Sequence, residues 1–243
     1  MYFKVYGATD VGQRRSNNED AFRYHVNKEK GRAIVAVADG VGGSAGGEVA
    51  SDIAVNCLVE EVINAIDSAG SQSALLESAF DHTNEILLKR KQEHSELSRM
   101  GTTLVACIAQ GERLVIGNVG DSRCYKINRD STDQLTTDHS LSEELKQQGL
   151  AYEDRMPYEN VITRVMGSDE LYRVDLFVCP LFAGDRFLFC SDGLTNFVSE
   201  TEMGTILHSG ADGAATIDKL IRTANQNGGG DNITAVILEC CQY

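Results

Sequence analysis

The sequence contains no tryptophan and only two prolines, Pro157 and Pro180, among its 243 residues. It also has no internal repeat, no low-complexity segment and no proline-rich linker that would separate two folding units. Hydrophobic residues make up 42% of the chain, which is enough to build one sizeable core. We therefore predict that residues 1–243 form a single domain.

Long apolar runs are absent as well. No stretch approaches the roughly 18 to 20 apolar residues that a membrane-spanning helix requires. The opening segment, MYFKVYGATD, alternates between apolar and polar side chains as a strand does, and it lacks the charged and apolar regions of an export signal. We therefore expect a cytoplasmic protein without a membrane partner.

Basic residues are in short supply, because 22 Lys and Arg stand against 36 Asp and Glu, a formal net charge of -14. Proteins that bind nucleic acid or anionic lipid rely on a surplus of Lys and Arg. The charge therefore argues against both kinds of partner.

The cysteines lack the C-x-x-C spacing of a zinc or redox motif, and their number is odd. Most of them lie inside apolar runs such as LVACIA and RFLFCSD, so we expect reduced thiols rather than a disulfide or zinc framework. The seven are Cys57, Cys107, Cys124, Cys179, Cys190, Cys240 and Cys241.

What is present is a set of short strand patterns and longer helical ones. Strands are expected at 2–9, 20–26, 32–38, 102–109, 112–119, 122–128, 173–179, 185–190 and 232–240. Helices are expected at 46–68, 72–92, 199–208 and 211–226. Strands in hairpins and helices in blocks indicate an α+β layered fold. The polar stretch 139–162 is expected to be a surface excursion with one short helix, SLSEELKQQG.

Four aspartates stand beside glycines at the ends of expected strands. Asp39, Asp121 and Asp192 each follow an apolar run, and Asp231 directly precedes one. Each one alone is typical of a turn, because Asp and Gly are both favoured there. Four such positions in one chain call for a joint explanation.

Carboxylates gathered at neighbouring strand ends would repel one another unless cations neutralised them. The candidate ligands are all oxygen atoms, which favours Mg²⁺ or Mn²⁺, with Ca²⁺ less favoured and Zn²⁺ disfavoured. The small residues after Asp39 would let the carbonyl of Gly40 approach a metal. We therefore predict a site for divalent cations.

A charged segment near the start, TDVGQRRSNNEDAF, joins Arg15 to Glu19 and Asp20. Such a segment is common as a turn between strands. Beside a metal site, however, the planar fork of Arg15 could bind two oxygens of a phosphate group.

Eight short motifs, in order along the chain, resemble the PP2C (PPM) family of metal-dependent serine/threonine protein phosphatases, in its bacterial branch. They are RRSNNED, VADGVGG, GTT, VGDSR, TTDHS, ITRVMG, CSDGL and GGGDN. The resemblance runs from about Thr9 to Leu238. It implies a central β-sandwich of two antiparallel sheets flanked by pairs of helices, a four-layer αββα arrangement.

The resemblance also implies a role for each candidate residue. Asp39 would bridge two Mg²⁺ or Mn²⁺ ions, the carbonyl of Gly40 would bind one of them, and Asp192 and Asp231 would bind the other. The roles implied for the remaining positions are metal contact through water for Glu19 and Asp20, a weaker third metal for Asp121 together with Asp192, phosphate binding for Arg15, and a flap beside the active site for residues 140–161.

The reaction implied is hydrolysis of phosphoserine or phosphothreonine by a hydroxide that bridges the two metals, with no covalent enzyme intermediate. The substrates would be phosphorylated proteins made by a serine/threonine kinase. Some relatives carry a His where this chain has Val41 or Ser44, which leaves the general acid unassigned. A metal-bound water is the preferred donor, and His139 is a poorer candidate that is typical of a hydrogen-bonded turn.

Three other interpretations remain open. A catalytically silent module could keep the fold and bind phosphoproteins, although all the core metal positions are retained here. A phosphatase for small phosphate esters is the second, and a comparison of phosphopeptides with nucleotides and sugar phosphates would separate it. A structural Ca²⁺ site is the third, but it does not account for Arg15. The acidic flap sequence YEDRMPYEN hints at a preference for phosphosites with basic flanks.

Overall fold

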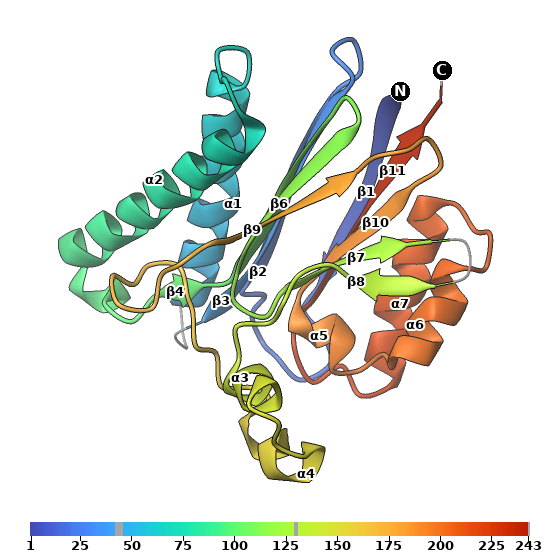
Figure 1. The fold of residues 1–243 in the computed structure, drawn as a ribbon. Helices are drawn as coiled ribbons and strands as arrows, with labels where there is room; N and C mark the ends of the chain where they lie inside the picture. The colour runs from blue at the N-terminus through green and yellow to red at the C-terminus, as the bar shows by residue number, and fades with distance from the viewer. Residues whose placement is uncertain (42–45, 129–130, 243) are drawn as a thin grey trace.

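The computed structural model describes residues 1–41, 46–128 and 131–242. Two antiparallel sheets form a sandwich (Figure 1). The first sheet has the strand order β1 (Tyr2–Asp10), β11 (Ile233–Cys241), β10 (Arg186–Cys190), β7 (Arg123–Ile127) and β8 (Thr132–Gln134). The second has the order β2 (Asp20–Asn27), β3 (Arg32–Val41), β5 (Leu104–Gln110), β6 (Arg113–Val119) and β9 (Asp175–Pro180), with the short β4 (Gly101–Thr102) paired to the end of β3.

Strand β3 shows how the sequence builds these layers. Its side chains alternate, so that Val35 and Val37 face the first sheet while Ala36 and Ala38 face the helices. Both faces are therefore buried, which explains why this strand is a continuous apolar run rather than an alternating one.

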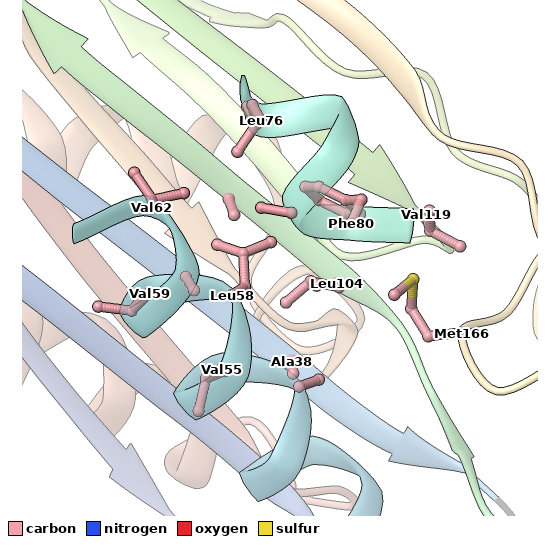
Figure 2. Packing of buried hydrophobic residues seen from close by; sticks show 14 of the residues in the cluster. Ala38, Val55, Leu58, Val59, Val62, Leu76, Phe80, Leu104, Val119 and Met166 are labelled. Atoms are coloured by element: carbon pink, nitrogen blue, oxygen red, sulfur yellow. The ribbon is translucent and has the colours of Figure 1, made fainter. Parts of the chain in front are cut away.

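Helices cover the outer face of each sheet. The second sheet carries α1 (Gly46–Ala65) and α2 (Gln72–Glu93), and the first carries α6 (Glu200–Leu207) and α7 (Gly213–Gln226). Figure 2 shows Leu58 of α1 and Phe80 of α2 packed together with Ala38 and Leu104 of the second sheet. The predicted four-layer αββα fold is thus confirmed. Within the described residues, no helix combines the length and hydrophobicity needed to cross a lipid bilayer.

Several predicted boundaries differ from the structure. The expected strand 102–109 is divided at Thr103 into β4 and β5, and the expected end of the strand before Asp39 is wrong, because β3 continues to Val41. The reason is tertiary, since β4 pairs with Gly40 and Val41 and so extends the ladder past the aspartate. Strand β8 and the four-residue helix α5 (Asp192–Thr195) were not predicted.

The flap, residues 140–161, projects from one end of the sandwich, close to α5 (Figure 1). It contains the predicted short helix, here α3 (Leu141–Gln147), which begins after the N-cap Ser140. A second helix, α4 (Tyr152–Arg155), and a 3₁₀ turn, η2 (Met156–Tyr158), follow it, while another 3₁₀ turn, η1 (Ser95–Leu97), lies after α2.

Candidate active site

Asp39 lies at the centre of a hydrogen-bonded clamp. Its amide donates to Thr103 Oγ1 at 3.0 Å, and its carbonyl accepts from Thr102 Oγ1 at 2.9 Å and from the Thr103 amide at 2.8 Å. Across the β2–β3 ladder, Asp20 is its direct partner. The motif GTT thus holds the backbone of Asp39 in place. Sequence analysis assigned no role to these two threonines, although they belong to a recognised motif.

Position 40 has room for glycine and not for a residue with a side chain. A Cβ there would lie 2.3 Å from the Gly47 carbonyl oxygen and 2.7 Å from that of Glu19, both of which belong to the backbone. The Gly40 amide also donates to the Glu19 carbonyl at 3.0 Å. The missing side chain therefore allows the start of α1 and the residue before β2 to close on β3.

Asp192 and Asp20 are connected through Ser191, which precedes α5. The Ser191 hydroxyl donates to Asp20 Oδ2 at 2.6 Å and accepts from the Thr234 amide at 3.0 Å. Asp192 Oδ2 accepts a hydrogen bond from the side-chain amide of Asn196 at 3.0 Å. These contacts bring the ends of β2, β10 and β11 together.

Arg15 reaches the site by an ion pair with Asp231, whose Oδ2 lies 2.9 Å from the guanidinium. Asn232 positions both residues, because its amide donates to Asp231 Oδ1 at 2.8 Å while its side-chain amide donates to the carbonyls of Val11 and Asn17, at 2.9 Å each. The side-chain oxygen of Asn232 also accepts from the Glu19 amide at 2.8 Å. Sequence analysis did not predict this role of Asn232, although the residue is the last one of the motif GGGDN.

These elements enclose a cavity of about 590 Å³ at the end of the sandwich that carries α5. Seven of the eight residues predicted for the site line it: Arg15, Glu19, Asp39, Gly40, Asp121, Asp192 and Asp231. The eighth, Asp20, is 7% exposed and is paired to Asp39. The lining residues that were not predicted include Val41, Asn196 and Phe197, the flap residues Glu159 and Asn160, and Ile162 just after the flap.

The electrostatics of the cavity call for cations. Burial raises the pKa of Asp20 to about 7 and that of Asp121 to about 7, and the charge of Asp192 adds to both effects. Burial and the neighbouring Asp20 raise the pKa of Asp39 well above its ordinary value, and the pKa of Asp192 is raised by burial and by Asp231. Divalent cations would remove this penalty, because they neutralise the carboxylates that burial disfavours.

Two buried oxygen atoms point to the same need. Asp20 Oδ1 and Asp192 Oδ1 have no hydrogen-bond partner among the described residues. Buried polar atoms without a partner are rare and require an explanation. The donor set is made of oxygen atoms, and its chemistry therefore fits Mg²⁺ or Mn²⁺.

Across the described ranges, no three Asp, Glu, His or Cys side chains form a group that could hold a metal ion as they stand. Asp231 is turned to Arg15, and its other oxygen is held by the Asn232 amide. A cation that recruits Asp231 must therefore compete with Arg15, and it leaves that guanidinium available for an anion.

His139 lies outside this cavity. It is buried, its Nδ1 accepts from the Gly120 amide at 3.0 Å, and its Nε2 lies 3.1 Å from Asp175 Oδ2. Burial lowers its pKa, which favours the neutral form of the ring. These contacts suit a hydrogen-bonding role in the turn rather than that of a general acid. Val41 lines the cavity but carries no proton to donate, and Ser44 lies outside the described residues.

The raised carboxyl pKa values predict how the stability of metal-free protein depends on pH. Between the ordinary Asp pKa of 3.8 and about 7, folded Asp20 and Asp121 keep protons that the unfolded chain has released. The free energy of unfolding should therefore fall as the pH rises from about 4 to about 7. Thermal unfolding with chelator at about pH 5, 6, 7 and 8 measures this fall. Added Mg²⁺ should reduce it, and a melting temperature that rises along the metal-free series would contradict the assignment.

Comparison with known proteins places this site in a family. Residues 11–236 match the family model for protein phosphatase 2C. The serine/threonine phosphatase Stp of Listeria innocua is 41% identical over 236 residues, which cover 95% of this chain and 93% of that protein. The crystal structure of the Mycobacterium tuberculosis phosphatase PstP/Ppp superposes with a TM-score of 0.89 at 30% identity, covering 100% of both chains.

A second solved structure bears on the metal. The catalytic domain of the phosphatase PstP, in complex with two manganese ions, superposes with a TM-score of 0.88 at 30% identity and covers 99% of each chain. Sequence motifs, fold and solved relatives thus agree along nearly the whole length. The chain belongs to the protein phosphatase 2C family, as a serine/threonine phosphatase of the bacterial type.

Proposed function

We propose that this protein hydrolyses phosphoserine and phosphothreonine in other proteins, using water activated by two Mg²⁺ or Mn²⁺ ions and forming no covalent enzyme intermediate. The observation that carries the proposal is one cavity lined by Arg15 and by the carboxylates of Asp39, Asp121, Asp192 and Asp231. No cysteine is among the described residues that line it, so the chemistry of a thiol nucleophile is not supported.

The proposed roles of the residues that would hold the ions come from the resemblance to the family, and most of these residues line the cavity. Asp39 would contact both ions, the Gly40 carbonyl would contact one of them, and Asp192 and Asp231 would contact the other. Through water, Glu19 and Asp20 would complete the set, and Asp121 with Asp192 would hold a weaker third ion. When bound, the ions would supply an activated water and neutralise charge on the phosphoryl group.

The protein's own groups would position the substrate. Arg15, released from Asp231, would bind two phosphoryl oxygens with its planar fork. Asp39 would be kept in place by its Thr102 and Thr103 contacts while charge develops nearby. The Val41 side chain has no acidic proton and His139 lies outside the cavity. We therefore propose that a water molecule would protonate the departing alkoxide.

The substrate class proposed is proteins phosphorylated by a serine/threonine kinase in the cytoplasm. In this proposal Glu159 and Asn160 of the flap, together with Ile162 just after it, would contact the polypeptide beside the phosphorylated residue, because all three line the cavity. The related proteins from Listeria innocua and Mycobacterium tuberculosis, which are serine/threonine phosphatases by name, support phosphoproteins over small esters.

The test is hydrolysis by metal-stripped protein that is titrated with Mn²⁺ or Mg²⁺. A phosphothreonine peptide should show no turnover without metal and a rise of at least about 100-fold at saturation. Nucleotides and sugar phosphates should be hydrolysed more slowly, as judged by kcat/KM. Metal binding without release of phosphate would instead favour a silent phosphoprotein-binding module, and a preference for the small esters would overturn the proposed substrate class.

A further inference from the structure

The flap is anchored at its base, which gives its later residues a defined place. Its two limbs are joined by a bridge between Ser140 and Ile162 and by a hydrogen bond from the Leu141 amide to the Val161 carbonyl at 2.8 Å. His139 connects this base to the β6–β7 turn, because its amide donates to the Gly120 carbonyl at 3.0 Å. The end of the flap is therefore held beside Asp121.

A second cavity, of about 340 Å³, lies beneath the flap and adjoins the reaction cavity. The residues that line both cavities are Asp121, Glu159, Asn160, Asp192 and Asn196. Three of these five are acidic, and Asp121 and Asp192 already belong to the proposed metal site. Glu159 is thus the acid that lines both cavities and has no role in the proposed metal site.

Beneath the flap, Arg123, Asp138 and Glu143 take part in ion pairs, whereas Arg155 has only neutral partners among the described residues. Arg123 makes a close ion pair with Asp138, with Nε 2.9 Å from Oδ2, and Glu143 pairs with Lys146 at 2.8 Å. Arg155 lines only the cavity beneath the flap, where its guanidinium lies 5.1 Å from the centre of the Tyr152 ring and donates to Ser142 at 3.4 Å.

Glu159 takes part in none of the ion pairs of the described residues. Its carboxylate raises the pKa of the Tyr152 hydroxyl, which is a neutral group. The side chain is exposed at the junction of the two cavities. Once cations neutralise the buried acids, Glu159 is the negative charge left uncompensated at the edge of the reaction cavity.

We propose that Glu159 selects substrates, favouring phosphosites that have Arg or Lys close to the phosphorylated residue. This inference rests on the proposed phosphatase function and assigns it a substrate class, basic phosphopeptides. Among the described residues that line the cavity, Glu159 is the acid that stays free to pair with a cationic side chain beside the phosphate. The net charge of -14 adds long-range attraction for such substrates.

The experiment compares kcat/KM for phosphothreonine peptides that differ at one flanking position, occupied in turn by Arg, Ala or Glu. Each position on both sides of the phosphothreonine is scanned with the Mn²⁺-loaded enzyme. The readout is the Arg-to-Ala ratio of kcat/KM within one enzyme, so that effects on chemistry or protein concentration cancel. The wild type, Glu159→Gln, Glu159→Lys and the control Glu153→Gln are compared, because Glu153 is an exposed acid of the flap that lines neither cavity.

The wild type should favour Arg over Ala at one or more positions by roughly three- to fivefold, the range expected for one partly exposed ion pair. Glu159→Gln should bring this ratio close to one and Glu159→Lys should invert it, whereas Glu153→Gln should keep the wild-type ratio. Mn²⁺-dependent turnover with the same ratio in the wild type and both Glu159 variants would overturn the role of Glu159 and leave the phosphatase proposal standing. Mn²⁺-loaded enzyme that hydrolyses none of the phosphopeptides would overturn both.

Discussion

Asp39→Asn is expected to lower kcat for a phosphothreonine peptide by at least about 1,000-fold. The substitution keeps the shape of the side chain and removes the charge that the proposed site shares between two cations. The backbone clamp from Thr102 and Thr103 does not involve the carboxylate, so the fold should persist. Phosphate release measured across a Mn²⁺ titration, together with calorimetric Mn²⁺ binding, reports both consequences.

Stability provides a second and opposite signature for Asp39→Asn. In metal-free protein the buried carboxyl has a pKa raised by burial and by Asp20, so its ionised form is costly to the fold. The metal-free variant should therefore be at least as stable as the wild type at about pH 8, where that cost is greatest. Loss of activity together with unchanged or higher stability excludes simple unfolding.

The matched control for Asp39→Asn is Glu85→Gln, which removes one negative charge from an exposed position on α2, away from the cavity. It should retain Mn²⁺ affinity and turnover close to those of the wild type. Near-normal turnover by Asp39→Asn itself would refute the assignment of Asp39 as the shared ligand.

Arg15→Ala is expected to lower kcat/KM by roughly 100-fold while Mn²⁺ affinity is kept or increased. The loss arises because no other described cation lines the cavity. Without Arg15, no described guanidinium would donate to two phosphoryl oxygens. The Mn²⁺ affinity should not fall, since Asp231 is freed from its ion pair with Arg15. Competition by inorganic phosphate and calorimetry with Mn²⁺ measure the two effects separately.

Two further variants make this experiment specific. Arg14→Ala removes a neighbouring exposed cation that does not line the cavity and should leave kcat/KM within about twofold of the wild type. Arg15→Lys keeps the charge without the planar fork and should recover only part of the loss. An Arg15→Ala enzyme that loses Mn²⁺ affinity in proportion to its activity would show that Arg15 organises the metal site rather than the phosphate. Because Arg15 is 52% exposed, little change in stability is expected.

Local pattern accounts for most of the fold. The helical periods at 46–68 and 72–92 predicted α1 (Gly46–Ala65) and α2 (Gln72–Glu93) closely, because each helix buries one continuous face on a sheet. The errors occur where a partner distant in sequence sets the element. β3 passes through Asp39 because β4 pairs with its end, a contact with residues about sixty positions later that periodicity does not register.

Residue types also predicted a chemistry for the candidate site, whereas they did not predict its geometry. Aspartates beside glycines at strand ends, with one arginine near the start, predicted oxygen ligands for divalent cations and a binder for phosphate, because these properties belong to the side chains themselves. The sequence did not predict that Asp20 is buried. Its burial depends on Ser191, just after β10, which donates to Asp20 and accepts from Thr234 of β11.

By itself, then, the sequence determined the layered fold and the kinds of atom at the site, because hydrophobic period and side-chain chemistry act locally. Only the tertiary structure decided that Asp231 pairs with Arg15 and that Asn232 hydrogen-bonds to the segment before β2. It also decided that Glu159 lines the same cavity as the proposed metal ligands. Each of these depends on which strand ends meet and on where the anchored flap returns. Packing between distant segments sets those distances, and no local pattern encodes them.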